Sequence, residues 1–247
     1  MSYMVDGYHG DTVAAAPVNE RVAFIRRTYA HVFGAILAFA GLSAALIASG
    51  VADQIINDVF RANRMSGLVL MVVFIVGSIA AQYMAQGNKS VGVKYAGLTL
   101  YVLLYTLLFV PILTIASNPA YGIAPANSPG KLPLQAGIVT LLAFAGLTAA
   151  VFASGKDFSF MGPILGICSF LALGVIIASL IAGFSLGLVF ISLMVALFAG
   201  YIVYDTSNII HRYNTNEHVA ASMALFGSFA MLFYYILMLF MSSGRDE

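Results

Sequence analysis

A chain of 247 residues that is 61% hydrophobic and only 9% charged cannot be a water-soluble domain, in which about 25% of residues are charged. Its formal net charge of +1 supplies no basic surface, so we expect no nucleic-acid partner. The single cysteine, Cys168, excludes an internal disulfide, and the four scattered histidines offer no zinc-ligand set. We therefore expect no metal and no cofactor.

The first twenty residues are polar and contain no Lys or Arg. Their three acidic residues are Asp6, Asp11 and Glu20. A cleaved signal peptide needs a basic start followed by a short apolar core, so we expect no signal peptide here. The composition predicts a flexible cytoplasmic tail over residues 1–20, followed by a transmembrane domain over residues 21–247.

Seven apolar blocks are long enough to cross about 30 Å of hydrocarbon, which takes about 20 helical residues. The blocks run from about Tyr29 to Gly50, Ser66 to Gln86, Tyr95 to Ser117, Leu134 to Ser154, Phe160 to Ala182, Leu186 to Asn208 and Val219 to Met241. Only AGFSLG (182–187) separates the fifth from the sixth, and Gly183 and Gly187 permit a tight turn there. If the fifth and sixth blocks formed one long bent helix instead, the number of spans would change and the C-terminus would lie on the other side. The sequence predicts an all-α polytopic membrane protein with seven transmembrane helices.

The distribution of basic residues gives an orientation, because Lys and Arg near span ends collect in the cytoplasm. With the N-terminus inside, the cytoplasmic set has seven members: Arg21, Arg26, Arg27, Lys89, Lys94, Lys156 and Arg212. The outer set has four: Arg61, Arg64, Lys131 and Arg245. This excess predicts a cytoplasmic N-terminus and a C-terminus outside.

Asp205 alone among the ten acidic residues lies within or at the edge of a predicted span, and no Lys or Arg lies inside any span. A strongly coupled transporter uses several intramembrane charges as a relay, so this pattern argues against one. The spans also contain no set of nucleophile, base and orienting group. We expect a protein that is not an enzyme and has no catalytic residue.

Two interpretations of Asp205 remain open. If the helix ends soon after Tyr204, the carboxylate is hydrated at the cytoplasmic interface. If the helix runs on to Tyr213, Asp205 lies about 12 Å from its end and must find a partner or take up a proton. Tyr201 and Asn208 are near enough on the same helix to donate hydrogen bonds, but no cation is in reach. A counter-group would then come from another helix.

Three segments resemble the Bax inhibitor-1 (TMBIM) superfamily. The segment GYIVYDTSNIIHRY (200–213) resembles the superfamily's Tyr-Asp-Thr motif before the last membrane helix. ERVAFIRRTYAHVFGAILAFAGL (20–42) is similar to the start of its first helix, and AASMALFGSFAMLFYYILMLF (220–240) to its final helix. The resemblance covers nearly the whole chain from Glu20.

The resemblance implies a seven-helix fold in which the last helix is central and surrounded by the other six. It also implies an activity, since some members behave as pH-sensitive calcium leak channels in which the motif's aspartate shares a proton with a second aspartate of the final helix. Here an ungapped alignment puts Ser228 at that second position and Met231 where Asn is usual. Serine resembles the bacterial YccA-like branch, which is tied to regulation of a membrane-bound AAA protease.

Functions of different classes follow from these features. The first is a non-enzymatic protein of the bacterial inner membrane that modulates or accompanies a membrane protein complex, with the AAA protease as the candidate partner. The second is a pH-sensitive calcium or proton leak gated near Asp205, with Ser228, Tyr201 and Asn208 as the other ion- or proton-sensing candidates. A structural role in lipid packing is the third. Each requires the lipid bilayer as partner.

Overall fold

The computed structural model describes residues 12–57, 65–121 and 130–243. Its helices are α1 (Val18–Ala48), α2 (Val51–Ile55), α3 (Ser66–Ala85), α4 (Val91–Ser117), the 3-10 helix η2 (Pro119–Tyr121), α5 (Lys131–Ser154), α6 (Met161–Ala182), α7 (Leu188–His211) and α8 (His218–Ser243). No strand is formed by these residues beyond an isolated antiparallel bridge between Thr12 and Asn214. Seven helices are long and apolar enough to cross a membrane, which confirms the all-α polytopic fold.

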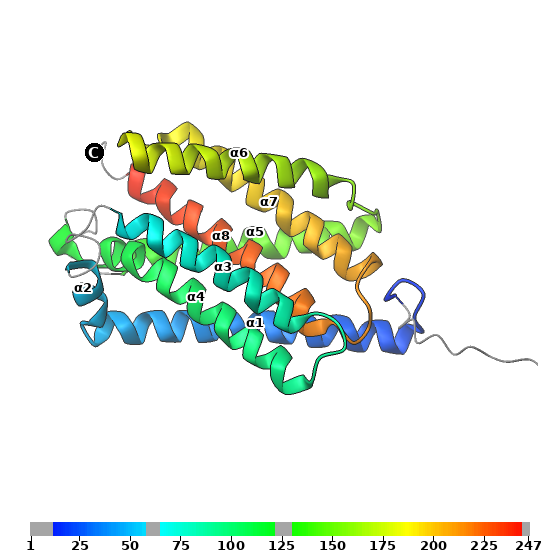
Figure 1. Cartoon of the computed structure of the whole chain (residues 1–247). Helices are drawn as coiled ribbons and strands as arrows, with labels where there is room; N and C mark the ends of the chain where they lie inside the picture. The colour runs from blue at the N-terminus through cyan, green and yellow to red at the C-terminus, as the bar shows by residue number, and fades with distance from the viewer. Residues whose placement is uncertain (1–11, 58–64, 122–129, 244–247) are drawn as a thin grey trace, which may run out of the picture.

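The helix junction at residues 182–187 confirms that α6 and α7 are two separate helices. Gly183 has a positive φ of 76°, and its N–H donates to Ser179 O at 2.8 Å, so it ends α6. Glycine adopts this conformation without the steric cost that a Cβ imposes. An odd number of crossings places the two ends of the bundle on opposite sides, and the start of α1 and the end of α8 lie at opposite ends of it (Figure 1).

The helices extend further than the predicted spans at the end where α1 begins. Helix α1 starts at Val18 instead of Tyr29, and α4 at Val91 instead of Tyr95. These helices therefore contain basic residues that the predicted spans excluded, including Arg27 and Lys94. The prediction was too short because the span rule counts apolar residues, whereas a helix continues through basic residues whose heads reach the interface.

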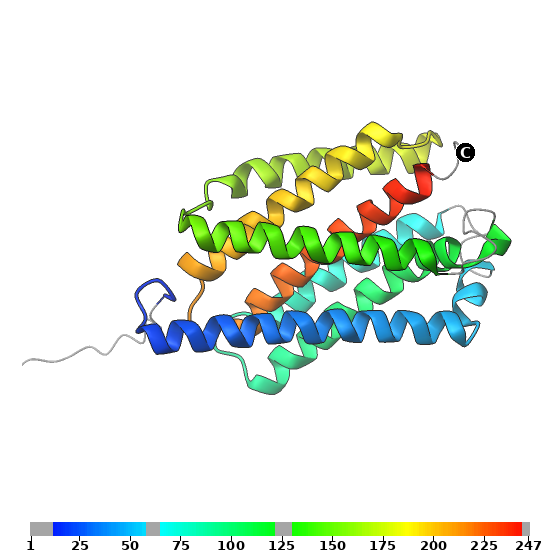
Figure 2. The same cartoon turned by 180° about the vertical axis from the view of Figure 1, so that it is seen from behind.

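Helix α8 is the central element, as the family resemblance implied. Five helices pack along it: α1, α3, α4, α5 and α7. In Figure 1 it passes diagonally between α1 and α7, behind α3, and in Figure 2 it lies behind α5. Helix α6 differs from the expectation of six surrounding helices, because it packs mainly on α7 and lies on the outside of the bundle.

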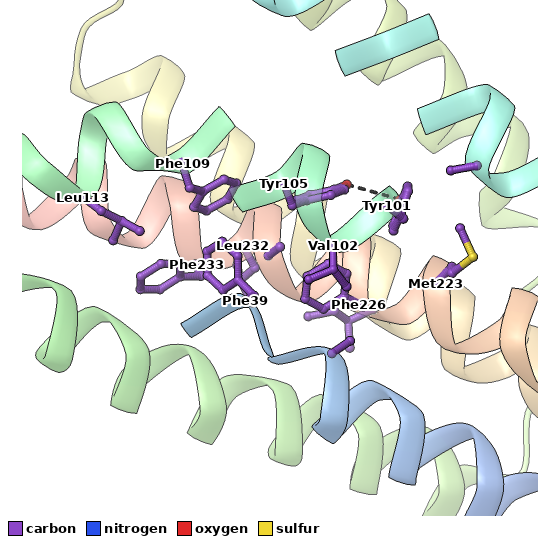
Figure 3. Close-up of a cluster of buried hydrophobic side chains, with 14 of the residues drawn as sticks. Phe39, Tyr101, Val102, Tyr105, Phe109, Leu113, Met223, Phe226, Leu232 and Phe233 are labelled. Atoms are coloured by element: carbon purple, nitrogen blue, oxygen red, sulfur yellow. Dashed lines mark hydrogen bonds between the residues drawn. The ribbon is translucent and has the colours of Figure 1, made fainter. Parts of the chain in front are cut away.

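Aromatic side chains fill the space between α1, α4 and α8 (Figure 3). Phe39 meets Phe109 edge-on at a ring-centroid distance of 5.1 Å, and Phe109 stacks on Phe233 at 6.0 Å. Phe226 joins the same cluster. Such pairs hold the helices through dispersion and ring electrostatics, so α8 is anchored against α1 and α4.

Residues 12–17 pack against the end of the bundle ahead of α1. Val13 is fully buried, and its N–H donates to Tyr213 O at 2.9 Å. Arg21 Nε donates to Val13 O at 3.1 Å. The predicted tail boundary at residue 20 is therefore too late, because this segment gains backbone hydrogen bonds and an apolar contact. Residues 1–11 of the predicted tail lie outside the described residues.

Candidate functional site

Asp205 is buried, which decides between the two interpretations of the sequence. Helix α7 continues for six residues beyond it to His211, about 9 Å of helix. The side chain is 8% exposed. The helix continues because Ile209 packs fully buried in a cluster with α1 and α8, so apolar contacts extend beyond the aspartate.

Ser228 of α8 is the partner of Asp205. Its hydroxyl donates a hydrogen bond to Asp205 Oδ2, and Ser228 is itself 7% exposed. Among the described residues Asp205 forms no ion pair, and Ser228 is its hydrogen-bond donor. The expected counter-group from another helix is thus a neutral hydroxyl.

A cavity of about 260 Å³ with several hydroxyl groups in its lining opens beside this pair. Its lining comes from α3, α4, α6, α7 and α8: Gln82, Tyr101, Tyr105, Ser169, Phe198, Tyr201, Asp205, Ala224, Gly227, Ser228 and Met231. A water molecule occupies about 30 Å³ of liquid, so the volume corresponds to about nine waters. Hydroxyl and amide groups provide these waters with the polar partners that they need.

Two tyrosines of α4 reach into the cavity opposite Gly227. The hydroxyl oxygens of Tyr101 and Tyr105 are 3.3 Å apart (Figure 3). A Cβ atom at position 227 would lie 2.5 Å from Tyr101 Oη and 2.9 Å from Tyr105 Oη. Both distances are shorter than van der Waals contact, so glycine on α8 is what lets the two hydroxyls approach the helix backbone.

The two other candidates from the sequence occupy different places. Tyr201, one turn before Asp205, lines the same cavity and shares a hydrogen bond of 2.9 Å with Ser169 of α6. Asn208, one turn after Asp205, is 9% exposed, and its Oδ1 has no partner among the described residues. It does not line the cavity. The structure therefore brings three of the four candidates together at the cavity, namely Asp205, Ser228 and Tyr201.

The loop between α5 and α6 closes over the end of α7. Asp157 Oδ1 accepts hydrogen bonds from the N–H of Ser159 at 2.8 Å and the hydroxyl of Ser207 at 3.4 Å. Ser207 Oγ also accepts from Phe158 N at 2.8 Å, and Arg212 Nη2 donates to Ser159 Oγ at 2.6 Å. The N–H of Ser159 is the main reason why the pKa of Asp157 lies below its ordinary range. We call this set of bonds the α5–α6 latch.

The residues that line the cavity from α3, α4 and α6 were not predicted from the sequence. Tyr101 and Tyr105 stand one helical turn apart in the middle of a span, where tyrosine is unusual because its hydroxyl needs a partner. That spacing was the available signal. Gln82 and Ser169 gave none, since single polar residues are common in spans. Across the ranges that the structure describes, no group of three metal-ligating side chains occurs.

Fold and site together define a class: a polytopic membrane protein with a carboxylate–hydroxyl pair buried between its last two helices. Comparison with known proteins identifies the family. The model of the family described as "Inhibitor of apoptosis-promoting Bax1" matches residues 21–245. The chain belongs to this Bax inhibitor-1 family, which confirms the family resemblance seen in the sequence.

Similar proteins occur in plants, animals and viruses. Protein LIFEGUARD 4 of Arabidopsis thaliana is 31% identical over 89% of this chain and 85% of its own length. Protein lifeguard 4 of Mus musculus is 28% identical over 94% of this chain and 90% of its own. The Golgi anti-apoptotic protein of Vaccinia virus (strain Lister) is 30% identical over 97% of this chain and 94% of its own length.

Proposed function

We propose that this protein is a pH-sensitive leak for protons or cations, with Asp205 as the group whose charge controls it. The observation that supports the proposal best is the position of Asp205 beside a hydroxyl-lined cavity in the interior of a transmembrane bundle. Intramembrane carboxylates are expensive to bury and mark ion or proton pathways. The bond to Ser228 alone does not supply the opposite charge that an ionised carboxylate needs.

The chemistry of the cavity favours a proton over calcium. Calcium takes six to eight oxygen ligands, usually with several carboxylates. The cavity offers one carboxylate, the amide of Gln82 and five hydroxyls. Hydroxyls and water can each donate and accept a hydrogen bond, so they can pass a proton along a chain. A calcium ion would be held weakly and only in transit.

Flux in liposomes that contain the purified full-length protein tests this proposal. We expect proton flux above that of empty liposomes, changing between pH 6 and pH 8, and at least a tenfold loss in Asp205→Asn. The matched control is Asp53→Asn, because Asp53 lies in α2 and accepts a hydrogen bond from Tyr121 far from the cavity. A flux that is unchanged in Asp205→Asn would contradict the proposal. Calcium is measured in parallel to identify the ion.

Binding to a larger membrane complex is the second candidate function, and the exposure of α6 favours it. Only Leu165 and Ala172 of this helix are buried. A row of large apolar side chains faces outward from it: Ile164, Ile167, Phe170, Leu171 and Ile181. The candidate partner stays a membrane-bound AAA protease. Affinity purification in mild detergent should recover a stoichiometric partner that Phe170→Ser releases; repeated recovery of the protein alone would count against this function.

We propose the bacterial inner membrane as the location, with the N-terminus in the cytoplasm. The family assignment and the seven apolar helices establish a multi-pass membrane protein. The excess of basic residues at the end where α1 begins supports the orientation. A protease site added at the N-terminus should resist protease added to intact spheroplasts and be cleaved after lysis. Cleavage in intact spheroplasts would reverse the orientation.

A further inference from the structure

A groove runs between α1 and α4 on the outer surface of the bundle, away from the Asp205 cavity. Its volume is about 340 Å³. Small residues of α1 form its floor, namely Gly34, Ala35 and Ala38, and its wall on α4 comprises Leu98, Thr99, Val102 and Leu103. On α1 it extends from Ala30 to Leu42, twelve residues or about 18 Å of helix. This length matches half of a hydrocarbon core of about 30 Å.

The groove ends in a cluster of nitrogen-bearing side chains. His31 Nδ1 lies 2.6 Å from the carbonyl oxygen of Arg27, so this nitrogen carries the hydrogen. His31 Nε2 lies 2.7 Å from Tyr95 Oη on α4. The ring centroids of His31 and of His218 on α8 are 5.2 Å apart. These residues lie near the starts of α4 and α8, so the cluster stands at the membrane edge on the side where α1 begins.

Two side chains at this end of the groove, Lys94 and His218, are incompletely partnered: Lys94 lacks an ion pair and His218 lacks a hydrogen bond among the described residues. Lys94 is 9% exposed, and its Nζ donates to Asn216 O at 3.3 Å without forming an ion pair with any described residue. Lysines are almost never buried to this degree unless they are paired. The buried Nδ1 of His218 has no hydrogen-bond partner in the described part of the chain. Both features indicate a missing anion.

The charged side chains that act on His218 are cationic. The positive charges of Arg27 and Lys94 both act on His218. Glu217, its neighbour in the sequence, is engaged with Asn214, whose backbone and side-chain nitrogens both donate to its carboxylate at 3.2 Å. An anion at this position would therefore be attracted by Arg27 and Lys94 and meet no competing carboxylate within the cluster.

We propose that this groove binds one anionic phospholipid, with its phosphate at the Arg27–Lys94 end and an acyl chain along Gly34 and Ala38. The guanidinium and ammonium groups donate charge-assisted hydrogen bonds to phosphate. The apolar groove then holds a chain of one leaflet's length. A zwitterionic lipid fits less well, since its own cationic group would be repelled by the basic cluster.

Native mass spectrometry of the detergent-purified full chain tests the charge requirement. We expect phosphatidylglycerol to bind at least tenfold more tightly than phosphatidylcholine with the same acyl chains. Arg27→Gln should weaken phosphatidylglycerol binding about fivefold, the effect of one basic residue at a lipid surface. Arg26→Gln is the matched control, because Arg26 is equally exposed but, unlike Arg27, is not among the charges that act on His218. Equal binding of the two lipids would overturn the proposal.

A second pair of variants tests the groove itself. Added Cβ atoms at Gly34 and Gly41 both meet open space, but only Gly34 lines the groove. Gly34→Leu should reduce phosphatidylglycerol binding more than tenfold, whereas Gly41→Leu should leave it unchanged. Equal losses in the two variants would overturn the proposal. So would full displacement of the lipid by millimolar inorganic phosphate, which would make this a site for soluble anions.

Discussion

Ser228 supplies the hydrogen bond that Asp205 receives from α8, and the two side chains are comparably buried. A second aspartate at position 228 would form a dyad in which like charges oppose each other and one proton is shared. A hydroxyl cannot do this. Any pH response of this protein near Asp205 must therefore come from a single carboxylate and its surroundings.

Removing this hydroxyl is expected to destabilise the fold. Ser228→Ala leaves a buried carboxylate without its donor, at a cost of about 1–3 kcal/mol, so the melting temperature in detergent should fall. The control is Ser222→Ala, since Ser222 is also buried on α8 but donates only to Val219 O of its own helix, at 2.7 Å. Equal melting temperatures for the two variants would contradict the assigned role of Ser228.

Gly227 is the second residue whose replacement has a defined result. Gly227→Ala forces the hydroxyls of Tyr101 and Tyr105 away from α8, and overpacking of this kind costs about 1–3 kcal/mol. Thermal unfolding should show the loss, and proton flux should change with it because the cavity lining moves. Gly166→Ala is the control, since a Cβ there meets nothing within 4 Å. A harmless Gly227→Ala would show that the tyrosines have room to move.

At the scale of elements, the α5–α6 latch holds α7 at Ser207, two residues beyond Asp205. Ser207 belongs to α7 and bonds both Phe158 N and Asp157 Oδ1. The loop therefore holds the helix turn that follows the buried carboxylate. Its charges stand outside the membrane-spanning helices, which separates its pH response from that of the cavity.

The latch is expected to stay closed throughout the physiological pH range. The pKa of Asp157 lies below its ordinary value of 3.8, chiefly because of the Ser159 N–H. A carboxylate with a depressed folded pKa stabilises the fold above the ordinary pKa and loses this effect only as pH falls through the lower folded value. Hydrogen exchange of residues 155–160, corrected for intrinsic rates, should not change between pH 5 and pH 8. Opening within that range would contradict this assignment.

At the scale of the whole molecule, α8 is the axis on which five other helices and the N-terminal segment converge. Val13 lies in one apolar cluster with Ile209 of α7 and with Ala221 and Leu225 of α8. The segment before α1 thus closes the end of the bundle nearest the Asp205 site. It joins the start of the chain to its last two helices.

A charge at Val13 should loosen this closure. Val13→Asp places an unpaired carboxylate in an apolar cluster, at a cost of about 2 kcal/mol or more, and should lower the melting temperature and expose residues 12–17 to protease. Ala15→Asp is the control, because Ala15 is exposed in the same segment, and its effect should stay within about 0.5 kcal/mol. If both variants are equally protected from protease, the segment does not depend on the buried valine.

The site was predictable in part. Asp205 stood out because a carboxylate among apolar residues is costly, and Ser228 was found through the family resemblance. Tyr101 and Tyr105 were missed because a helix pattern gives their spacing but not the helix they face. Asn208 was named for its distance from Asp205 along one helix, yet its Oδ1 has no partner among the described residues and it does not line the cavity.

The sequence by itself determined that this is an all-α membrane protein with seven crossings, because the length and composition of apolar blocks act locally along the chain. It also determined that one acidic residue lies in the membrane region. Only the tertiary structure decided that Asp205 is buried, that a cavity adjoins it and that Lys94 has no ion-pair partner among the described residues. Those properties depend on which helices lie side by side, and contacts between distant segments leave no local pattern in the sequence.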